Sequence, residues 1–171
     1  VVETEGWISG DFHVHSARSS DVGVDLTDRV RSYLGEGVEF LSSSDHDALT
    51  RYEPIIHENG WDGWMTSQVG IETSPLMLGH FLSFPMNYDE TEPQGMPEET
   101  AFDWIGWNED HGHHHKNPQE LVADLRAGGA LGGGGDSVVV IPHVYDYFNY
   151  FGLDPFSLSL DPGIFGLFDL F

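Results

Sequence analysis

The sequence predicts an α/β domain with a mostly parallel sheet. Strand-like and helix-like segments alternate along the chain, which is the pattern of βα units. The segment VVVI at 138–141 is a continuous apolar run, typical of a strand buried on both faces. The length of 171 residues suits one domain, so we expect 1–171 to form a single unit.

The predicted elements follow from local patterns. The segment 7–15 alternates as a strand and places His13 and His15 on one face. A helix is expected over 25–34, ending at Gly35 or Gly37. The remaining expected elements are strands at 38–43, 66–71, 81–84 and 138–141, a helix with Tyr52, Ile55 and Ile56 on one face, and a helix capped by Asn117 that buries Leu121 and Leu125 and ends at Gly128. Residues 85–117 show no clear period, and we expect a long excursion there.

Composition excludes several classes of partner. The chain has 29 Asp and Glu against six Lys and Arg, and its formal charge of −23 repels phosphate backbones and anionic membrane surfaces. We therefore expect no nucleic-acid partner. No apolar run approaches the length of a membrane span, so no membrane insertion is expected. The lack of cysteine leaves His, Asp and Glu as the only strong metal ligands.

Histidines and carboxylates gather at or near the ends of the predicted strands. They are His13, His15, Asp45, His46, Glu72, His80 and His143. In a parallel sheet most of these side chains would converge on one rim. Two imidazoles on one strand face can bind one ion, and a carboxylate such as Glu72 can bridge two. Neutral imidazole with carboxylate suits zinc, manganese or iron. Two ions about 3.5–4 Å apart could clamp a phosphate or acyl oxygen.

Five short motifs, in order, resemble the PHP (polymerase and histidinol phosphatase) superfamily, and more narrowly its CehA/McbA-type metallohydrolases. They are HVHS at 13–16 followed by Asp21, SDH at 44–46, GIET at 70–73, GHF at 79–81 and IPHVYDYFNYFGLDP at 141–155. The resemblance covers roughly residues 7–163. It implies a distorted βα barrel that holds up to three divalent metal ions.

The resemblance also implies roles for individual residues. The implied metal ligands are His13 and His15 for a first ion, Glu72 bridging to a second that His80 and His143 complete, and Asp21 with His46 for a third. The residues implied nearest the reaction are Asp45, Glu72 and His143, with Asp45 orienting the site rather than binding metal.

The C-terminal part departs from the family pattern. The family closes its site with a late Asp-x-His pair, and no histidine follows His143. Its Asn-His-Pro-Arg is replaced by Ile141-Pro142-His143-Val144, which removes an arginine that could hold an anion. We expect a barrel that is incomplete at its C-terminus, in an excerpt of a longer chain whose final strand or strands lie beyond Phe171.

The resulting prediction is a metal-dependent hydrolase. It would activate water against a phosphoester, or against a carbamate, ester or amide bond, in an anionic or carbamate/ester small-molecule substrate. Two alternatives stay open: a catalytically inactive PHP-like module that holds metal for structure or partner recognition, and an inactive excerpt. The compartment also stays open, although the acidity and the lack of cysteine are compatible with a periplasmic or secreted location.

Other conspicuous residues have simpler expected roles. The histidine run within 111–115 matches none of the family motifs and is expected to bind metal only adventitiously. His57 is expected on the surface of a helix. Arg18 and Arg51 each follow a ligand motif, and we expect both to pair with carboxylates rather than with substrate.

Overall fold

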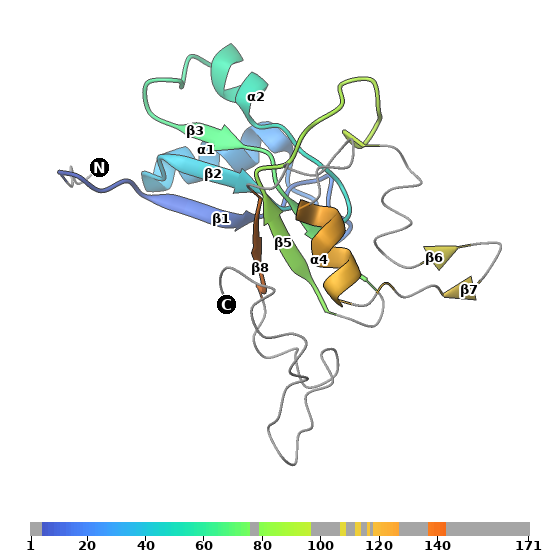
Figure 1. Ribbon diagram of the computed structural model, residues 1–171. Helices are drawn as coiled ribbons and strands as arrows, with labels where there is room; N and C mark the ends of the chain where they lie inside the picture. Colours follow the sequence, from blue (N-terminus) through green and yellow to red (C-terminus); the bar gives the residue numbers. More distant parts are fainter. Residues whose placement is uncertain are drawn as a thin grey trace.

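The computed structural model describes residues 5–75, 79–96, 107–108, 112–113, 116, 118–126 and 137–142. Its main elements are two three-stranded sheets with helices packed beside them (Figure 1). The first sheet is β1 (Gly10–Val14), β2 (Phe40–Ser43) and β3 (Thr66–Gln68), and the second is β4 (Ile71–Thr73), β5 (Phe81–Phe84) and β8 (Val138–Val140). The remaining elements are the pair β6 (Trp107–Asn108) and β7 (Gly112–His113) and the helices α1 (Leu26–Glu36), α2 (Glu53–Glu58) and α4 (Pro118–Arg126).

The first sheet is parallel and carries α1 and α2. The α1 helix begins after Asp25, whose side chain accepts a hydrogen bond from the Thr27 backbone, and ends at Gly37 in the left-handed region with φ 82°. The expected helix over 25–34 and its glycine stop are therefore confirmed. The apolar residues of these elements form one buried cluster: Val14, Val30, Leu41, Tyr52, Ile56 and Met65.

The second sheet packs against α4. Leu121 and Leu125 are fully buried, which confirms the expected inner face of this helix. They join a cluster with Ile71, Phe81 and Val139 from the three strands. The expected Asn117 cap and Gly128 stop lie outside the described residues.

The strands of the second sheet are antiparallel, which corrects the expectation of a mostly parallel sheet. Ile71 pairs with Ser83 and Thr73 with Phe81, and β5 pairs with β8 in the same sense. Only residues 74–80 join β4 to β5, whereas a parallel crossover needs a dozen residues or more. The described strands do not close into a barrel. The barrel stays a prediction, because residues 143–171 lie outside the described part.

The chain passes from one sheet to the other at Gly70. The strand expected over 66–71 is divided there, with β3 in the first sheet and β4 in the second. A Cβ atom on Gly70 would lie 2.5 Å from the Ser43 carbonyl oxygen and 2.8 Å from Ser42 Oγ. Only glycine allows this approach. The change of sheet at Gly70 places Glu72 beside the end of β2, where Glu72 and His46 form an isolated parallel bridge.

The start of the expected excursion is part of the folded structure. Met86 and Met96 are buried in the second cluster, and the Met86 amide donates to the Val69 carbonyl at 2.8 Å. The Leu49 amide donates to the Gln94 carbonyl at 3.0 Å. Methionine is flexible and fits irregular space, so the burial of these two side chains requires no periodic pattern.

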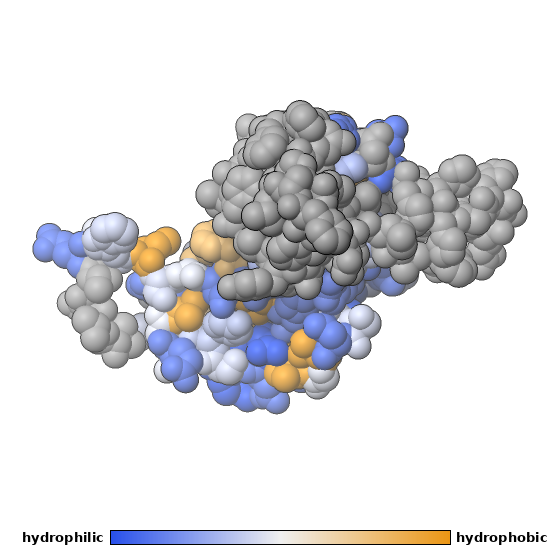
Figure 2. Space-filling view, turned by 90° about the horizontal axis from the view of Figure 1, so that it is seen from below, coloured by the Kyte–Doolittle hydropathy of each residue, from blue (hydrophilic) through white to orange (hydrophobic). Residues whose placement is uncertain are grey.

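One face of the described part is mostly polar. Where the face seen from below is coloured in Figure 2, hydrophilic residues predominate and apolar residues form small separate patches. Within the described ranges, no helix combines the length and the apolar character needed to cross a membrane.

We predict that Gly70→Ala lowers the free energy of unfolding by about 1–3 kcal/mol, because the added methyl group overpacks the switch between the sheets. Gly63→Ala is the matched control, since nothing lies within 4 Å of a Cβ atom at that position. Urea unfolding of both variants measures the difference. Equal stability of the two variants would show that the backbone at Gly70 moves aside without cost.

Candidate metal centre

Six of the predicted ligand side chains meet where the two sheets adjoin. They are His13 and His15 at the end of β1, Asp21 in the loop that follows, His46 after β2, Glu72 in β4 and His80 before β5. The ring centroids of successive histidines lie 4.9, 4.8 and 4.9 Å apart. The four imidazoles therefore form a continuous row around one carboxylate.

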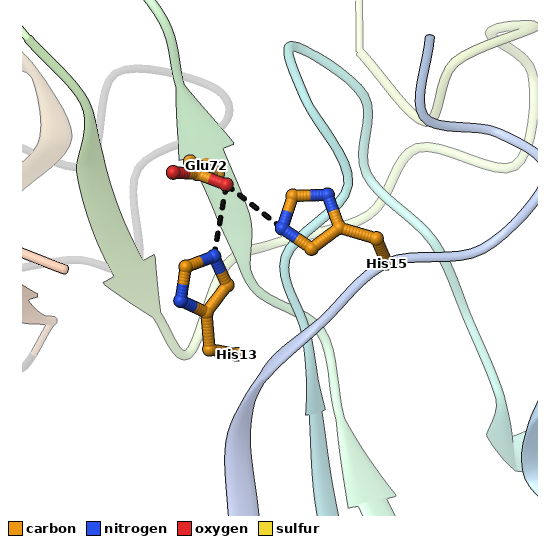
Figure 3. A group of neighbouring side chains, drawn as sticks. All are labelled: His13, His15 and Glu72. Atoms are coloured by element: carbon orange, nitrogen blue, oxygen red, sulfur yellow. Dashed lines mark hydrogen bonds and ion pairs between the residues drawn. The ribbon is translucent and has the colours of Figure 1, made fainter. Parts of the chain in front are cut away.

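Glu72 lies at the centre of this row and is fully buried. Its Oε2 atom lies 3.0 Å from His13 Nε2 and 2.9 Å from His15 Nε2 (Figure 3). The same oxygen lies 3.7 Å from His46 Nε2, whereas Oε1 lies 2.9 Å from His80 Nδ1. The two carboxylate oxygens thus face different histidines, which is the arrangement that a bridging ligand requires.

The cluster keeps Glu72 ionised. Burial alone would raise the pKa of its carboxyl, but hydrogen bonds from His13, His15 and His80 outweigh burial and hold that pKa well below its usual range. The hydrogen bond to Glu72 raises the pKa of His15 despite burial. Burial lowers the pKa of His46, because the attraction of Glu72 does not compensate for it. A buried anion is therefore balanced by the imidazoles around it.

The loop after β1 brings Asp21 back to the cluster. The Ala17 amide closes this loop on the Val24 carbonyl at 2.7 Å. Asp21 Oδ1 lies 3.4 Å from His15 Nδ1, and Oδ2 lies 3.7 Å from His46 Nε2. Burial raises the pKa of Asp21, but a hydrogen bond from Ser19 and the nearby His15 bring it below its usual value.

Asp45 lies beneath the cluster rather than in it. It is fully buried, and its Oδ1 accepts from the Ser16 amide at 2.5 Å. Its Oδ2 accepts from the hydroxyls of Ser16, at 2.8 Å, and of Thr50. Both oxygens are occupied in joining the ends of β1 and β2. These contacts suit the orienting role that the resemblance implies for Asp45, and its place among the catalytic residues stays a prediction.

The described residues form three groups that could hold a metal ion, with candidate ligand atoms within 4.8 Å of one another. The groups are His13, His15 and Glu72; His15, Asp21 and His46; and His46, Glu72 and His80. The first group is the set that the resemblance implies for one ion, and the second includes the implied pair of Asp21 and His46. The resemblance joined His80 to His143, and that pairing stays a prediction. His143 lies outside the described residues. His15, His46 and Glu72 each belong to two groups. If two groups were occupied, each of these residues would bind either both ions or only one of them.

Three polar residues at the site have no part in the sequence predictions. Ser19 and Ser74 contact the rings of His15 and His46. Asp47 has φ 52°, accepts from the Ser74 amide at 2.9 Å, and has a pKa that burial raises to about 6. The only sequence signals were their positions beside the ligand motifs, in SARSSD, SSDHD and IETS.

The two arginines near the ligand motifs, Arg18 and Arg51, have different kinds of hydrogen-bond partner. Arg51 pairs with Glu53 at 3.1 Å and with Glu90, as expected. The Arg18 guanidinium instead donates to the Pro93 carbonyl. The prediction that Arg18 pairs with a carboxylate is therefore wrong within the described residues. This hydrogen bond joins the loop after β1 to the segment around Pro93.

His57 is exposed on α2, as expected, and lies 3.2 Å from Asp62. The expectation for the histidine run at 111–115 concerns side chains outside the described part of the structure.

Comparison of the chain with family models, curated proteins and solved structures finds no match. The PHP assignment therefore stays a prediction that rests on the five motifs. The candidate metal centre rests separately on the geometry of the described residues.

We predict that zinc affinity falls as the pH is lowered, and that the fall begins above pH 6.5. Metal binds deprotonated imidazole, and the pKa of His15 lies above its ordinary value of 6.5. Above that pKa the ring is available to zinc, and below it a proton competes. Chelator competition between about pH 5 and 9, on protein with the 111–115 histidines replaced, measures this dependence. An affinity that stays constant down to pH 6 would contradict it.

Proposed function

We propose that this chain is a metal-dependent hydrolase whose His/Asp/Glu cluster holds two or three divalent ions of zinc, manganese or iron. The observation that carries the proposal is the buried Glu72 carboxylate, with imidazoles within 3.0 Å of both oxygens. Burying a carboxylate is costly unless it is paired or binds metal. The nitrogen and oxygen donors of this cluster fit the proposed ions.

Different residues of the described part would hold different ions. His13 and His15 would hold an ion together with Glu72, and His80 would hold a second ion together with the same carboxylate. Bound divalent ions would supply Lewis-acid chemistry, polarising the bond to be cleaved and lowering the pKa of water. Asp45 would hold the ends of β1 and β2 in register beneath them.

Exposure indicates the side from which a substrate would approach. Glu72 is fully buried, whereas the side chains of His13, His80 and Asp21 are 30%, 34% and 51% exposed. Glu72 therefore forms the floor of the cluster, and these three residues form its solvent-facing edge. A small substrate would meet that edge first.

The proposed substrate is a small phosphoester, or a small carbamate, ester or amide. The resemblance to PHP enzymes supports the first class, and the narrower resemblance to CehA/McbA-type enzymes supports the second. The charge of −23 disfavours a nucleic acid as the phosphoester.

The second candidate function is a metal-binding module without turnover. The sequence feature that favours it is Ile141-Pro142-His143-Val144, which stands where PHP enzymes have Asn-His-Pro-Arg and lacks the arginine that could hold an anionic substrate.

We predict that replacing both His13 and His15 with Ala strips the metal and lowers the melting temperature, because metal binding is coupled to folding. Metal at 100 to 1,000 times its Kd contributes about 3–4 kcal/mol of stability, which the double variant should lose. His57→Ala is the control, since that side chain is 80% exposed. Elemental mass spectrometry and thermal unfolding, with the 111–115 histidines replaced, give the readouts. Full metal content in the double variant would show that the cluster is not the binding site.

We predict that the metal-loaded protein hydrolyses chromogenic substrates of one of the two classes. Glu72→Gln should abolish this activity, because the neutral amide cannot serve two ions as an anion. Replacing the histidines of 111–115 should leave it intact. A fully loaded protein that hydrolyses neither class would favour the metal-binding module.

A further inference from the structure

Two serine hydroxyls contact candidate histidine ligands at the ring nitrogen that does not face Glu72. Ser19 Oγ lies 3.0 Å from His15 Nδ1, and Ser74 Oγ lies 2.5 Å from His46 Nδ1. In both rings the other nitrogen, Nε2, faces Glu72 Oε2, at 2.9 Å for His15 and 3.7 Å for His46. We propose that Ser19 and Ser74 are positioning residues that select Nε2 as the metal-binding atom of His15 and His46. The inference rests on the proposed metal centre.

The hydrogen bonds of Ser19 determine which nitrogen of His15 carries a hydrogen. A hydroxyl donates one hydrogen and accepts two. Ser19 donates to Asp21 Oδ1 at 2.6 Å, because an ionised carboxylate can only accept, and it accepts from the His46 amide at 3.1 Å. Its remaining contact, with His15 Nδ1, must then be one in which Nδ1–H donates. Nδ1 carries a hydrogen whether or not Nε2 does, so Nε2 is the atom left for a metal.

Ser74 contacts His46 at the same ring nitrogen. When its hydroxyl directs its hydrogen to the Glu72 carbonyl oxygen at 3.3 Å, it accepts from His46 Nδ1–H. The Ser74 amide donates to Asp47 Oδ1 at 2.9 Å, which holds the backbone of Ser74 beside the cluster. Because the hydroxyl contacts Nδ1, Nε2 is the nitrogen of His46 that faces the cluster as a ligand atom.

Ser19 has a second effect, because it contacts every member of one candidate group. It is buried, and it holds the ring of His15, the carboxylate of Asp21 and the backbone of His46. By occupying Oδ1 of Asp21 it leaves Oδ2, the oxygen that lies 3.7 Å from His46 Nε2. One hydroxyl thus aligns three residues from two separate segments.

The test compares zinc affinity in Ser19→Ala and Ser74→Ala with that in Ser20→Ala, an exposed serine of the same loop. Loss of such an orienting partner weakens metal binding by about 10- to 100-fold, and we expect this for the first two variants only. Ser19→Thr keeps the hydroxyl and should bind zinc like the wild type. Circular dichroism verifies that each variant is folded.

Ring-nitrogen NMR provides a readout that does not depend on activity. In zinc-loaded wild type, His15 and His46 should carry hydrogen on Nδ1 and bind zinc through Nε2. In metal-free wild type, the His15 Nδ1–H signal should be protected from exchange, and Ser19→Ala should abolish that protection.

The outcomes separate this inference from the proposed function. If wild type binds none of zinc, manganese and iron, the proposed function fails, and the metal-free Nδ1–H signal still decides the hydrogen-bond assignment. Ligation through Nδ1, an unprotected Nδ1–H in wild type, or unchanged zinc affinity in both Ala variants would each overturn the positioning role.

Discussion

The structure around the candidate site depends on one buried anion. Glu72 has no exposed surface, and its two oxygens are held by histidines from both sheets. A buried carboxylate is tolerated only with partners of this kind, so the ends of β1, β2 and β4 must lie close together. The supporting bonds of Asp45 and the serine contacts behind the rings serve the same geometry.

Much of this arrangement is predictable from local patterns. The alternation of GDFHVH places His13 and His15 on one side of a strand, and both rings meet the same oxygen of Glu72. Helix signals at Asp25 and Gly37 define α1, and the spacing of Leu121 and Leu125 defines the buried face of α4. These features depend on neighbours within a few residues, which is why the sequence reveals them.

Other features depend on contacts between distant segments. The passage between the sheets at Gly70 is set by the backbone of Ser43, which no local pattern reports. Asp45 and His46 are adjacent, yet one faces Ser16 and the other the cluster, and only the long-range hydrogen bonds distinguish them. The serines escaped prediction because serine is common in loops and its role here depends on the ring that it meets.

The change of sheet at Gly70 also has a mechanical consequence. It distributes the candidate ligands over the two sheets. His13, His15 and His46 lie in or just after strands of the first sheet, and Glu72 and His80 lie in or just before strands of the second. An ion held between them would tie His15 to Glu72 across a loop of about 60 residues, the long-range kind of closure for which a cross-link removes most freedom from the unfolded chain. In a protein without cysteine, the ion would take the place of a disulfide bond, as a staple that can be removed by a chelator instead of a reductant.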